Sequence, residues 1–349
     1  MIKVYSLDQE SEWKKIVLSF KKADVYYLPE YVKAFYKNGD GTPLLIFYCN
    51  NRIQAINVVI KRDISSLPRY NNVLESNMYF DYTTPYGYGG ILFNSPNSKD
   101  DKRIFFEEYI QHCKEHNIIT EFIRFNPIRN NYKGLKDWIE VSPVGPTISI
   151  LTNDLEQTWM NYSSKNRNTI RRSRRNNVQV FWGVSKDIMH IFKNLYIETM
   201  KRDNANKYYY FSDSFFDSLY DDMKYNSLIF YAMHENRVIS AAYVMIFGDK
   251  IHYHLSASDY NYRYLSPTNL LLHEVAVYAY SNKHDEVHLG GGLGGEMDNL
   301  YKFKKAFNTK VDNTFAVGKV ILNQEIYSML IEGIEKDTFF PLYRKSMPL

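Results

Sequence analysis

The order of secondary-structure elements in the second half of the chain constrains its fold most strongly. Three strand-like segments, at 227–235, 237–248 and 250–258, follow one another and are joined by short turns. A long helical pattern over 266–282 and another strand pattern over 286–291 come next. This order predicts a mixed α/β domain.

The other segments of the chain extend the same theme. In the second half, strands are predicted at 147–152 and 178–183, and helices at 154–177, 185–202, 212–225 and 298–307. In the first half, strands are predicted at 3–7, 43–49, 53–62 and 119–127, and helices at 8–20, 28–38 and 99–117. A last strand at 313–322 and helix at 323–336 are expected to return to the first domain. The two halves therefore predict a structural repeat without a repeated sequence.

Chain length and composition constrain the number of domains and the class of protein. A chain of 349 residues is long enough for two domains, each with its own core. No run approaches 18 uninterrupted apolar residues, and the first residues lack the apolar core of a signal peptide. The two cysteines, Cys49 and Cys113, have no metal-binding spacing, which disfavours a disulfide scaffold and a zinc site. We therefore expect a cytoplasmic protein without a metal.

The most basic stretch, "RNTIRRSRRNN" at 167–177, holds five arginines in a protein whose net charge is only +4. If this stretch is helical, Arg167, Arg171 and Arg174 lie on one face, and no acidic residue within the run offsets them. Guanidinium groups bind phosphate through paired, charge-assisted hydrogen bonds. We expect these arginines to contact phosphate from tRNA, CoA or a nucleotide-linked acceptor. A solvated helix face is the alternative.

A second unusual stretch, "LGGGLGGEM" at 289–297, holds five glycines and leads into the helical pattern at 298–307, with Asp298 placed to cap it. The spacing excludes a P-loop. Backbone N–H groups around Gly291 and Gly292 are expected to approach an anion or a carbonyl, and a flexible turn is the alternative.

The first half contains one candidate binding segment, "YFDYTTPYGYGGILF" at 79–93, which is too rich in glycine and proline for regular structure. Tyr86 and Tyr88 offer flat faces for a sugar or a peptide, and Asp81 is expected to orient an amine or to accept its proton. The alternative is a loop packed by its own aromatic rings.

His252 and His254 alternate along one predicted strand, so both side chains face one side of the sheet. Either could act as a general base, and His254 is the preferred candidate. A structural histidine is the alternative. No covalent nucleophile is predicted, because the chain has no G-x-S-x-G motif and neither cysteine sits in a Cys/His context.

The segments "SSKNRNTIRRSRRNNVQV" and "SPTNLLLHEVAVYAYSNKHDEVHLGGG", followed by "DNLYKFKKAF", resemble two motifs of the FemABX-type aminoacyltransferases. The element order of residues 149–312 likewise resembles the GNAT acyltransferase fold. This resemblance implies two GNAT-like domains packed side by side with a cleft between them, in a mixed α/β architecture. We place the acceptor-side domain at 1–148, joined by 322–349, and the donor-binding domain at 149–321.

The resemblance also implies roles for individual residues. In that family the Phe-Lys pair, here Phe303 and Lys304, faces the reacting ester, so Lys304 is expected to stabilise an oxyanion. Thr268 and Asn269, inside the motif that opens the long helix, are expected to contact the donor. Arg202 precedes a loop that reaches a substrate cleft in the relatives and is expected to bind substrate.

The function implied is amide formation, with an aminoacyl group transferred from aminoacyl-tRNA to an amine of a cell-envelope precursor such as a peptidoglycan precursor. An N-acetyltransferase that uses acetyl-CoA is the alternative, although "YRYLSPTNLL" lacks the glycine pair of a CoA pyrophosphate loop. In both cases the donor is a co-substrate and no cofactor is bound permanently. The acceptor is expected to be nucleotide- or lipid-linked, and the sequence leaves peripheral membrane association and oligomeric state open.

A third possibility comes from another class of protein. A non-catalytic RNA-binding protein would use the same arginine run to bind RNA, with an affinity that falls steeply with salt. Aromatic residues do not alternate with these arginines, which counts against a single-strand binder. A degenerate pair of GNAT-like domains that serves as a scaffold also stays open.

Overall fold

The computed structural model describes residues 1–94, 97–310 and 312–345, and the chain divides into two units. Unit 1 comprises residues 1–143 and 315–349, and unit 2 comprises residues 144–314. The boundaries expected from sequence, 148/149 and 321/322, fall instead inside one strand and at the end of another. Among the described residues, no helix is both long and apolar enough to span a bilayer.

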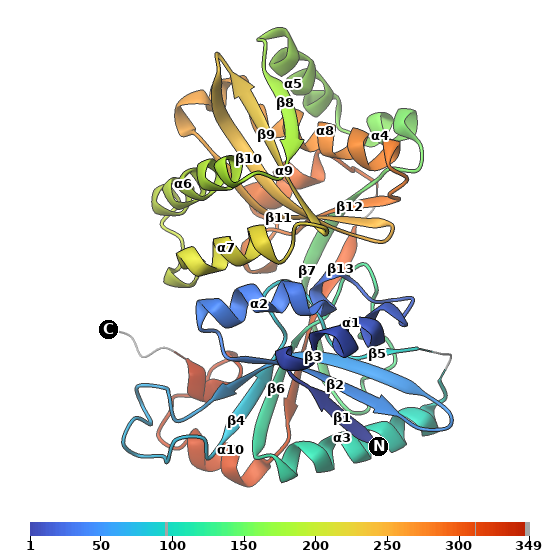
Figure 1. The fold of residues 1–349 in the computed structure, drawn as a ribbon, viewed down its shortest axis with the longest axis vertical. Coiled ribbons are helices and arrows are strands. Elements are labelled where there is room, and N and C mark those ends of the chain that lie inside the picture. The colour runs from blue at the N-terminus through green and yellow to red at the C-terminus, as the bar shows by residue number, and fades with distance from the viewer. Residues whose placement is uncertain (95–96, 311, 346–349) are drawn as a thin grey trace. The chain divides into compact units, whose positions relative to one another are not determined.

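Unit 1 is a mixed sheet with helices between its strands (Figure 1). Its elements are β1 (Ile2–Tyr5), α1 (Glu10–Leu18), α2 (Pro29–Asn38), β2 (Thr42–Cys49), β3 (Gln54–Asp63), β4 (Phe80–Thr83), β5 (Leu92–Phe93), α3 (Lys99–Glu115), β6 (Ile118–Arg124), β13 (Asn313–Ile321) and α10 (Gln324–Leu330). The strand order is β1-β2-β3-β4-β6-β13, with β5 paired to β3. All neighbours are antiparallel except β4 and β6, which are parallel.

Unit 2 contains most of the second half of the chain. Its elements are β7 (Glu140–Leu151, which begins in unit 1), α4 (Leu155–Asn161), α5 (Ser164–Arg175), β8 (Gln179–Gly183), α6 (Lys186–Arg202), α7 (Asp213–Asp221), β9 (Ser227–His234), β10 (Arg237–Phe247), β11 (Lys250–Ser258), α8 (Pro267–Ser281), β12 (Glu286–Gly290) and α9 (Asn299–Lys305). The strand order is β8-β9-β10-β11-β12-β7, and only β11 and β12 are parallel.

The two units therefore share one pattern of strand directions: three antiparallel pairs, one parallel pair and a final antiparallel pair. This is the structural repeat expected from the order of elements. In both units a long helix, α3 or α8, separates the two parallel strands along the chain, as a parallel connection requires.

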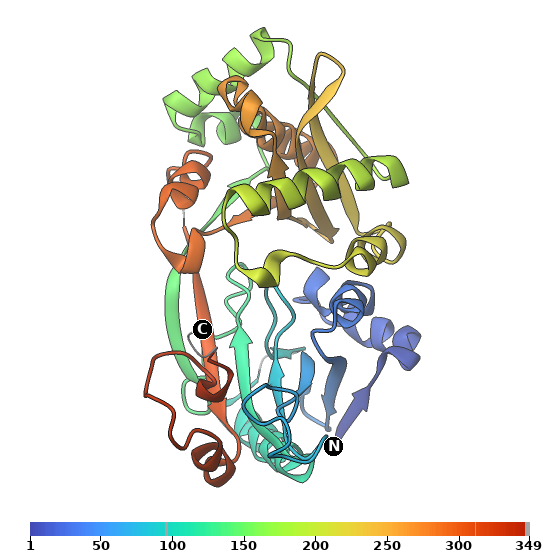
Figure 2. The same cartoon turned by 90° about the vertical axis from the view of Figure 1, so that its left-hand side faces the viewer.

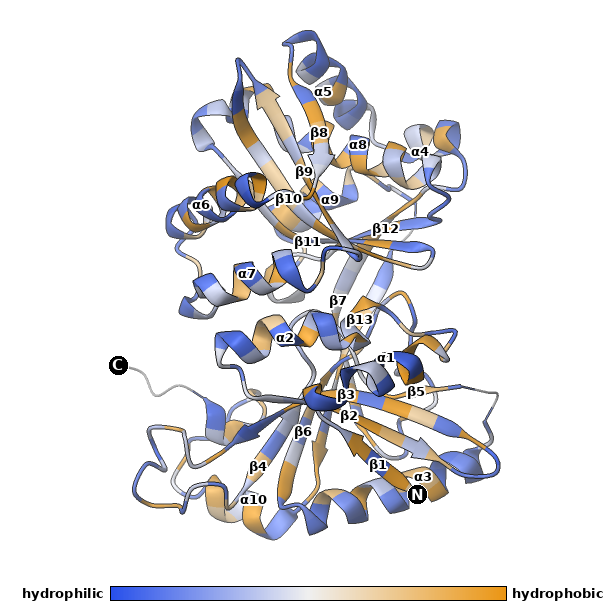
Figure 3. Cartoon of the chain, in the orientation of Figure 1, coloured by the Kyte–Doolittle hydropathy of each residue, from blue (hydrophilic) through white to orange (hydrophobic). Residues whose placement is uncertain are grey.

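Helices cover both faces of the sheet in unit 2. On one face, α8 packs with the apolar residues of the strands in a core that includes Ile150, Phe230, Leu271 and Val287. On the other face, α6 lies across β10 and β11, as Figure 2 shows in yellow-green against gold. Figure 3 shows the expected contrast between apolar strands and the strongly hydrophilic helix α5.

Two local predictions from sequence were wrong. The segment 79–93 is not irregular throughout, because Phe80–Thr83 form β4, which pairs on both sides with β3 and β6. The glycine and proline signal belongs only to the turns that follow this short strand.

The helix predicted over 154–177 is two helices, α4 and α5. The chain breaks at Tyr162, which has an extended backbone, and Ser163 then caps α5 by accepting a hydrogen bond from the Asn166 N–H at 3.2 Å. Asp154 starts α4 as expected, because its carboxylate accepts the Gln157 N–H at 3.0 Å.

Glu121 of β6 is a buried carboxyl group of unit 1 and is 1% exposed. It accepts hydrogen bonds from the Asn57 amide at 2.7 Å and from the Tyr109 hydroxyl at 2.9 Å. Burial raises the pKa of Glu121 to about 7, and the two hydrogen bonds oppose part of that rise. The folded state therefore holds this proton more tightly than the unfolded chain does.

Glu121 should make the stability of the protein depend on pH. A raised pKa in the folded state stabilises fully below the unfolded pKa near 4.5 and is lost as pH rises through about 7. The Glu121→Gln variant keeps one acceptor for Asn57 and offers Tyr109 a donor. Relative to it, the wild type should lose roughly 2–3 kcal/mol of unfolding free energy between pH 4.5 and pH 7.

Urea unfolding of both proteins across this pH range measures that difference. The matched control is Glu115→Gln, at the exposed end of α3, which should run parallel to wild type. Parallel pH profiles for wild type and Glu121→Gln would contradict the prediction.

Candidate functional site

The two parallel strands of unit 2 part after a short common stretch. Their ladder pairs Lys250 with Glu286 and ends at His252 opposite His288, and the described residues show no further pairing between them. Strand β11 nevertheless continues to Ser258, whereas β12 ends at Gly290, which has a left-handed backbone with φ of 75°. Beyond this point the described backbone groups of β11 and β12 no longer pair with each other, and such unpaired groups are able to bind a ligand.

Three polar side chains lie in register where the strands part. Ser149 of β7 is opposite His288 of β12, and His288 is opposite His252 of β11, a set that we call the polar row. The Ser149 hydroxyl lies 3.1 Å from His288 Nδ1 and accepts a hydrogen bond from the Asn313 amide at 3.0 Å. The two imidazole rings are 6.0 Å apart between centroids. These contacts fix His288 at the site.

Sequence reasoning found only His252 from the polar row. Ser149 and His288 lie in short strand patterns, and neither has a motif. The one available signal was that each alternates with apolar neighbours, which places its side chain on the opposite side of the sheet from theirs.

His254, the preferred general base from sequence, lies at an irregularity of β11. Leu255 pairs with Tyr243 and Tyr253 pairs with Val244, so His254 is the extra residue of a β-bulge. Burial, together with the nearby His252, lowers the pKa of His254 to about 3. A group with so low a pKa takes up a proton poorly near neutral pH, which makes His254 a weak candidate for that role.

The glycine-rich turn after β12 is packed against its own chain. A Cβ on Gly292 would lie 2.0 Å from the Glu296 carbonyl oxygen, and a Cβ on Gly291 would lie 2.6 Å from the Pro146 oxygen. Asp298 caps α9 by accepting the Tyr301 N–H at 2.8 Å and also accepts the Leu293 N–H at 3.3 Å. The glycines are thus explained by close backbone packing, and a carboxylate of the chain already binds one amide of the turn.

Lys304 binds this glycine-rich turn. Its ammonium group donates to the Gly291 carbonyl at 2.7 Å, and the residue is 8% exposed. Burial lowers the pKa of Lys304 to about 8, although Asp298 opposes the shift. Phe303 instead packs on the apolar core and on Phe307, so the two members of the Phe-Lys pair face different surroundings.

The three arginines predicted to form one face of α5 each have a partner within unit 2. Arg167 donates to the Tyr162 carbonyl at 2.5 Å, and the Arg171 guanidinium lies 5.2 Å from the centre of the Trp159 ring. Arg174 forms an ion pair at 2.6 Å with Glu274 of α8, a partner that sequence reasoning overlooked.

Helix α5 is attached to both α8 and α9. The Ser163 N–H donates to the Ala306 carbonyl at 2.9 Å, at the end of α9. Asn166 accepts a hydrogen bond from Asn269 at 2.8 Å, and Thr268 lies 3.0 Å from the Ser240 hydroxyl. Thr268 and Asn269 therefore hold the first turn of α8 in place.

Arg202, at the end of α6, donates to the Ser258 carbonyl at 2.8 Å and pairs with Asp203, also at 2.8 Å. It therefore lies at the end of β11, where that strand has already left β12.

The predicted acceptor residues belong to unit 1. Asp81 is fully buried in β4, where it accepts hydrogen bonds from Arg62 at 2.8 Å and from Tyr343 at 3.1 Å and forms an ion pair with Arg344. A carboxylate enclosed by two arginines and a hydroxyl of its own chain has a structural role.

Tyr86 and Tyr88 are half-buried in the loop after β4. The Tyr86 carbonyl accepts the Tyr31 hydroxyl at 2.5 Å, and the Tyr88 ring packs edge-on against Tyr26 and Phe315. Burial raises the pKa of Tyr88 to about 12. The loop is thus packed by aromatic rings, which was the alternative reading of its sequence.

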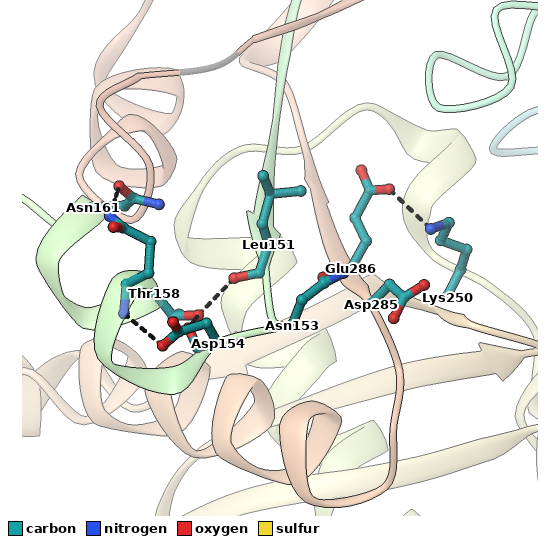
Figure 4. A pocket seen from close by; sticks show the side chains of 9 residues that line it. Leu151, Asn153, Asp154, Thr158, Asn161, Lys250, Asp285 and Glu286 are labelled. Carbon is teal, nitrogen blue, oxygen red and sulfur yellow. Dashed lines mark hydrogen bonds and ion pairs between the residues drawn. The ribbon is translucent and has the colours of Figure 1, made fainter.

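A separate cavity of about 400 Å³ lies at the other end of β11 and β12, where both strands begin (Figure 4). Lys250 and Glu286 line it, with their charged groups 3.3 Å apart, together with Asp154 and Asp285. The parting of the strands therefore lies at the opposite end from this cavity.

Comparison with known proteins agrees with this geometry. Residues 164–305, from the start of α5 to the end of α9, match the family model described as an acetyltransferase (GNAT) domain. No curated protein matches the sequence.

Several solved structures share the fold over nearly the whole chain. FemX superposes with a TM-score of 0.67 at 14% identity, covering 94% of this chain and 99% of FemX. A domain provisionally assigned to a lysylphosphatidylglycerol synthetase of Agrobacterium fabrum gives a TM-score of 0.59 at 9% identity, covering 93% and 95%. A tandem GNAT protein from the clavulanic acid biosynthesis pathway gives 0.50 at 7% identity, covering 93% and 99%.

At these identities the structural likeness concerns the fold alone. It confirms the predicted mixed α/β architecture of tandem GNAT type. Residues 164–305 thus match the GNAT acetyltransferase family, and the chain as a whole has the fold of the tandem GNAT structures.

Proposed function

We propose that this protein forms an amide by transferring an aminoacyl group from aminoacyl-tRNA to an amine of a cell-envelope precursor, such as a peptidoglycan precursor. The observation that carries the proposal is the parting of β11 and β12 beside the polar row. A donor carbonyl between the strands would meet an amine on the side of the sheet that carries the histidines.

The chemistry requires alignment, proton removal and charge stabilisation. The acceptor nitrogen attacks the ester carbon, and His288 accepts the proton that the nitrogen loses. The ammonium of Lys304, at the Gly291 end of the turn, balances the negative charge on the carbonyl oxygen. The C–O bond of the ester then breaks, and the departing ribose hydroxyl takes up a proton.

Transfer of an acetyl group from acetyl-CoA is the second candidate, and the family match to an acetyltransferase domain favours it. The segment before α8 favours the tRNA donor, because a short 3₁₀ helix at Tyr260–Leu265 takes the place of a glycine loop. The resemblance of the sequence motifs to those of FemABX-type aminoacyltransferases supports the same donor.

Donor identity can be tested with two labelled pools, aminoacyl-tRNA and acetyl-CoA, each offered with a nucleotide-linked peptide that bears a free amine. We expect label to pass from tRNA to the peptide, with deacylated tRNA as the second product. Transfer from acetyl-CoA alone would show that acetyl-CoA is the donor. RNA binding without transfer from either pool would refute the proposed acyltransferase activity.

The Lys304→Met variant keeps the bulk of the side chain and removes its charge. Turnover should fall by roughly two orders of magnitude, as for loss of one oxyanion-hole donor. The melting temperature should also fall, because the Gly291 carbonyl loses its partner. Steady-state kinetics and thermal unfolding measure the two effects.

The matched control is Lys302→Ala, an exposed lysine on the same helix, which should change neither quantity. Because the pKa of Lys304 is about 8, wild-type turnover should also decline as pH rises past 8, and residual Lys304→Met activity should lack this decline. Full turnover in Lys304→Met would show that Lys304 takes no part in the reaction.

Substitution of His288 and of His254 distinguishes a catalytic histidine from a structural one. His288→Ala should lower turnover at saturating substrate by about 10²-fold or more, because the proton acceptor is lost. His254→Ala, in the bulge, should retain most of its turnover at a temperature well below unfolding. The opposite ranking of the two variants would assign the proton transfer to His254.

A further inference from the structure

The cavity at the start of β11 and β12 has a polar lining that the proposed reaction does not use. We call it the α4 cavity, because Asp154, Gln157, Thr158 and Asn161, at the cap of α4 and within it, form one side. Its volume of about 400 Å³ falls in the range of small-molecule sites. Of the described residues that line it, Leu151 alone has an apolar side chain. The cavity therefore suits a small, polar ligand.

The α4 cavity adjoins the polar row on the same face of the sheet. Leu151, Glu286 and Lys250 lie opposite one another across β7, β12 and β11, two residues away from the polar row on each strand. Residues two apart in a strand face the same side and are separated by about 7 Å. The cavity is thus a neighbour of the polar row and is lined by a different set of side chains.

Negative charge dominates the lining. Its ionisable groups are the carboxylates of Asp154, Asp285 and Glu286 and the ammonium group of Lys250, which gives a formal balance of −2. Lys250 already pairs with Glu286 at 3.3 Å and with Asp249 at 3.0 Å. The exposed Asp285 carboxylate has no hydrogen-bond or ion-pair partner among the described residues. An excess of carboxylates attracts a cation.

A buried amide group in the lining also lacks a partner. Asn161 is 9% exposed, and its Oδ1 accepts a hydrogen bond from the Gln157 amide at 2.9 Å. Its Nδ2 donates to no group in the described part of the chain, and Figure 4 shows this nitrogen directed toward Leu151. A buried donor without an acceptor is costly unless water or a ligand accepts its hydrogen bond. The lining therefore suits a ligand with an oxygen acceptor as well as a cationic group.

The arrangement of the carboxylates favours an organic cation over a metal ion. In residues 1–94, 97–310 and 312–345, no three histidine, cysteine, aspartate or glutamate side chains gather in a way that could hold a metal ion. A metal ion also could not accept the hydrogen bond that Asn161 Nδ2 offers. Both requirements are met by an ammonium group with hydroxyl groups close by.

We propose that the α4 cavity binds an amino sugar. The ammonium group of the sugar pairs with Asp285, and one hydroxyl group accepts a hydrogen bond from Asn161 Nδ2. A second hydroxyl donates to the carboxylate oxygen of Asp154 that is not used to cap α4, and the C–H face of the ring packs on Leu151. This binding does not depend on the proposed acyl transfer.

Calorimetry with the full-length protein and three probes tests the proposal. Glucosamine carries both an ammonium group and hydroxyl groups, glucose carries hydroxyl groups without charge, and putrescine carries charge without hydroxyl groups. We expect one glucosamine per chain, bound at least about tenfold more tightly than either other probe. No binding of glucosamine, or equal or tighter binding of glucose or putrescine, would overturn the proposal.

Two variants locate the binding in the cavity. Asp285→Asn removes a charge that pairs with no described residue, so it should weaken glucosamine binding about tenfold without affecting the fold. Asn161→Ala should weaken glucosamine binding about fivefold, through loss of one hydrogen bond, and leave putrescine binding unchanged. Thermal unfolding checks that both variants are folded.

Asp217→Asn is the matched control, because Asp217 is exposed on α7 and has no ion-pair partner in the described ranges. It should bind glucosamine as wild type does. Wild-type affinity for glucosamine in both Asp285→Asn and Asn161→Ala would show that the sugar binds elsewhere and would refute the site.

Discussion

The separation of two parallel strands in unit 2 is the constraint on which the functional interpretation depends. Parallel neighbours normally hydrogen-bond along their whole common length. Here β11 and β12 stop pairing after His252 and His288, and β11 then carries a bulge at His254. Ending the ladder early forgoes hydrogen bonds between the two strands. A ligand that binds the unpaired backbone groups would offset that loss. Everything assigned to the donor lies beside or beyond that point.

The same strand pattern in unit 1 has a different outcome. Its parallel pair, β4 and β6, runs from Phe80 to Thr83 without such an early end. The polar residue of β4, Asp81, is enclosed by Arg62 and by Tyr343 and Arg344 from the end of the chain. The repeat therefore supplies two similar frameworks, and the polar row in register is a feature of unit 2.

Much of this architecture could be predicted from the sequence, because local patterns determine it. Apolar periodicity and short turns located most strands and helices, and the caps at Asp154 and Asp298 are where they were expected. The motifs around the arginine run and the Phe-Lys pair pointed to the GNAT fold, and the segment that contains them matches a GNAT family model. Each of these signals spans only a few neighbouring residues, so it can be recognised without knowledge of the tertiary structure.

The candidate site could not be predicted from the sequence, because it is formed by contacts between residues that are far apart along the chain. Glu274 neutralises Arg174 across 100 positions, and Ser149 meets His288 across 139. No spacing rule connects such pairs. The break at Tyr162 was missed because a serine that could continue a helix serves instead as a cap. The burial that lowers the pKa of His254 is likewise a property of the folded neighbourhood.

Helix α9 has a mechanical consequence that its short length conceals. Within three residues it binds the glycine turn through Lys304 and, through the Ala306 carbonyl at its end, the first turn of the arginine helix. A shift of α9 would therefore displace the glycine-rich turn and the start of α5 together. The positions of these two segments are coupled through the last turn of α9.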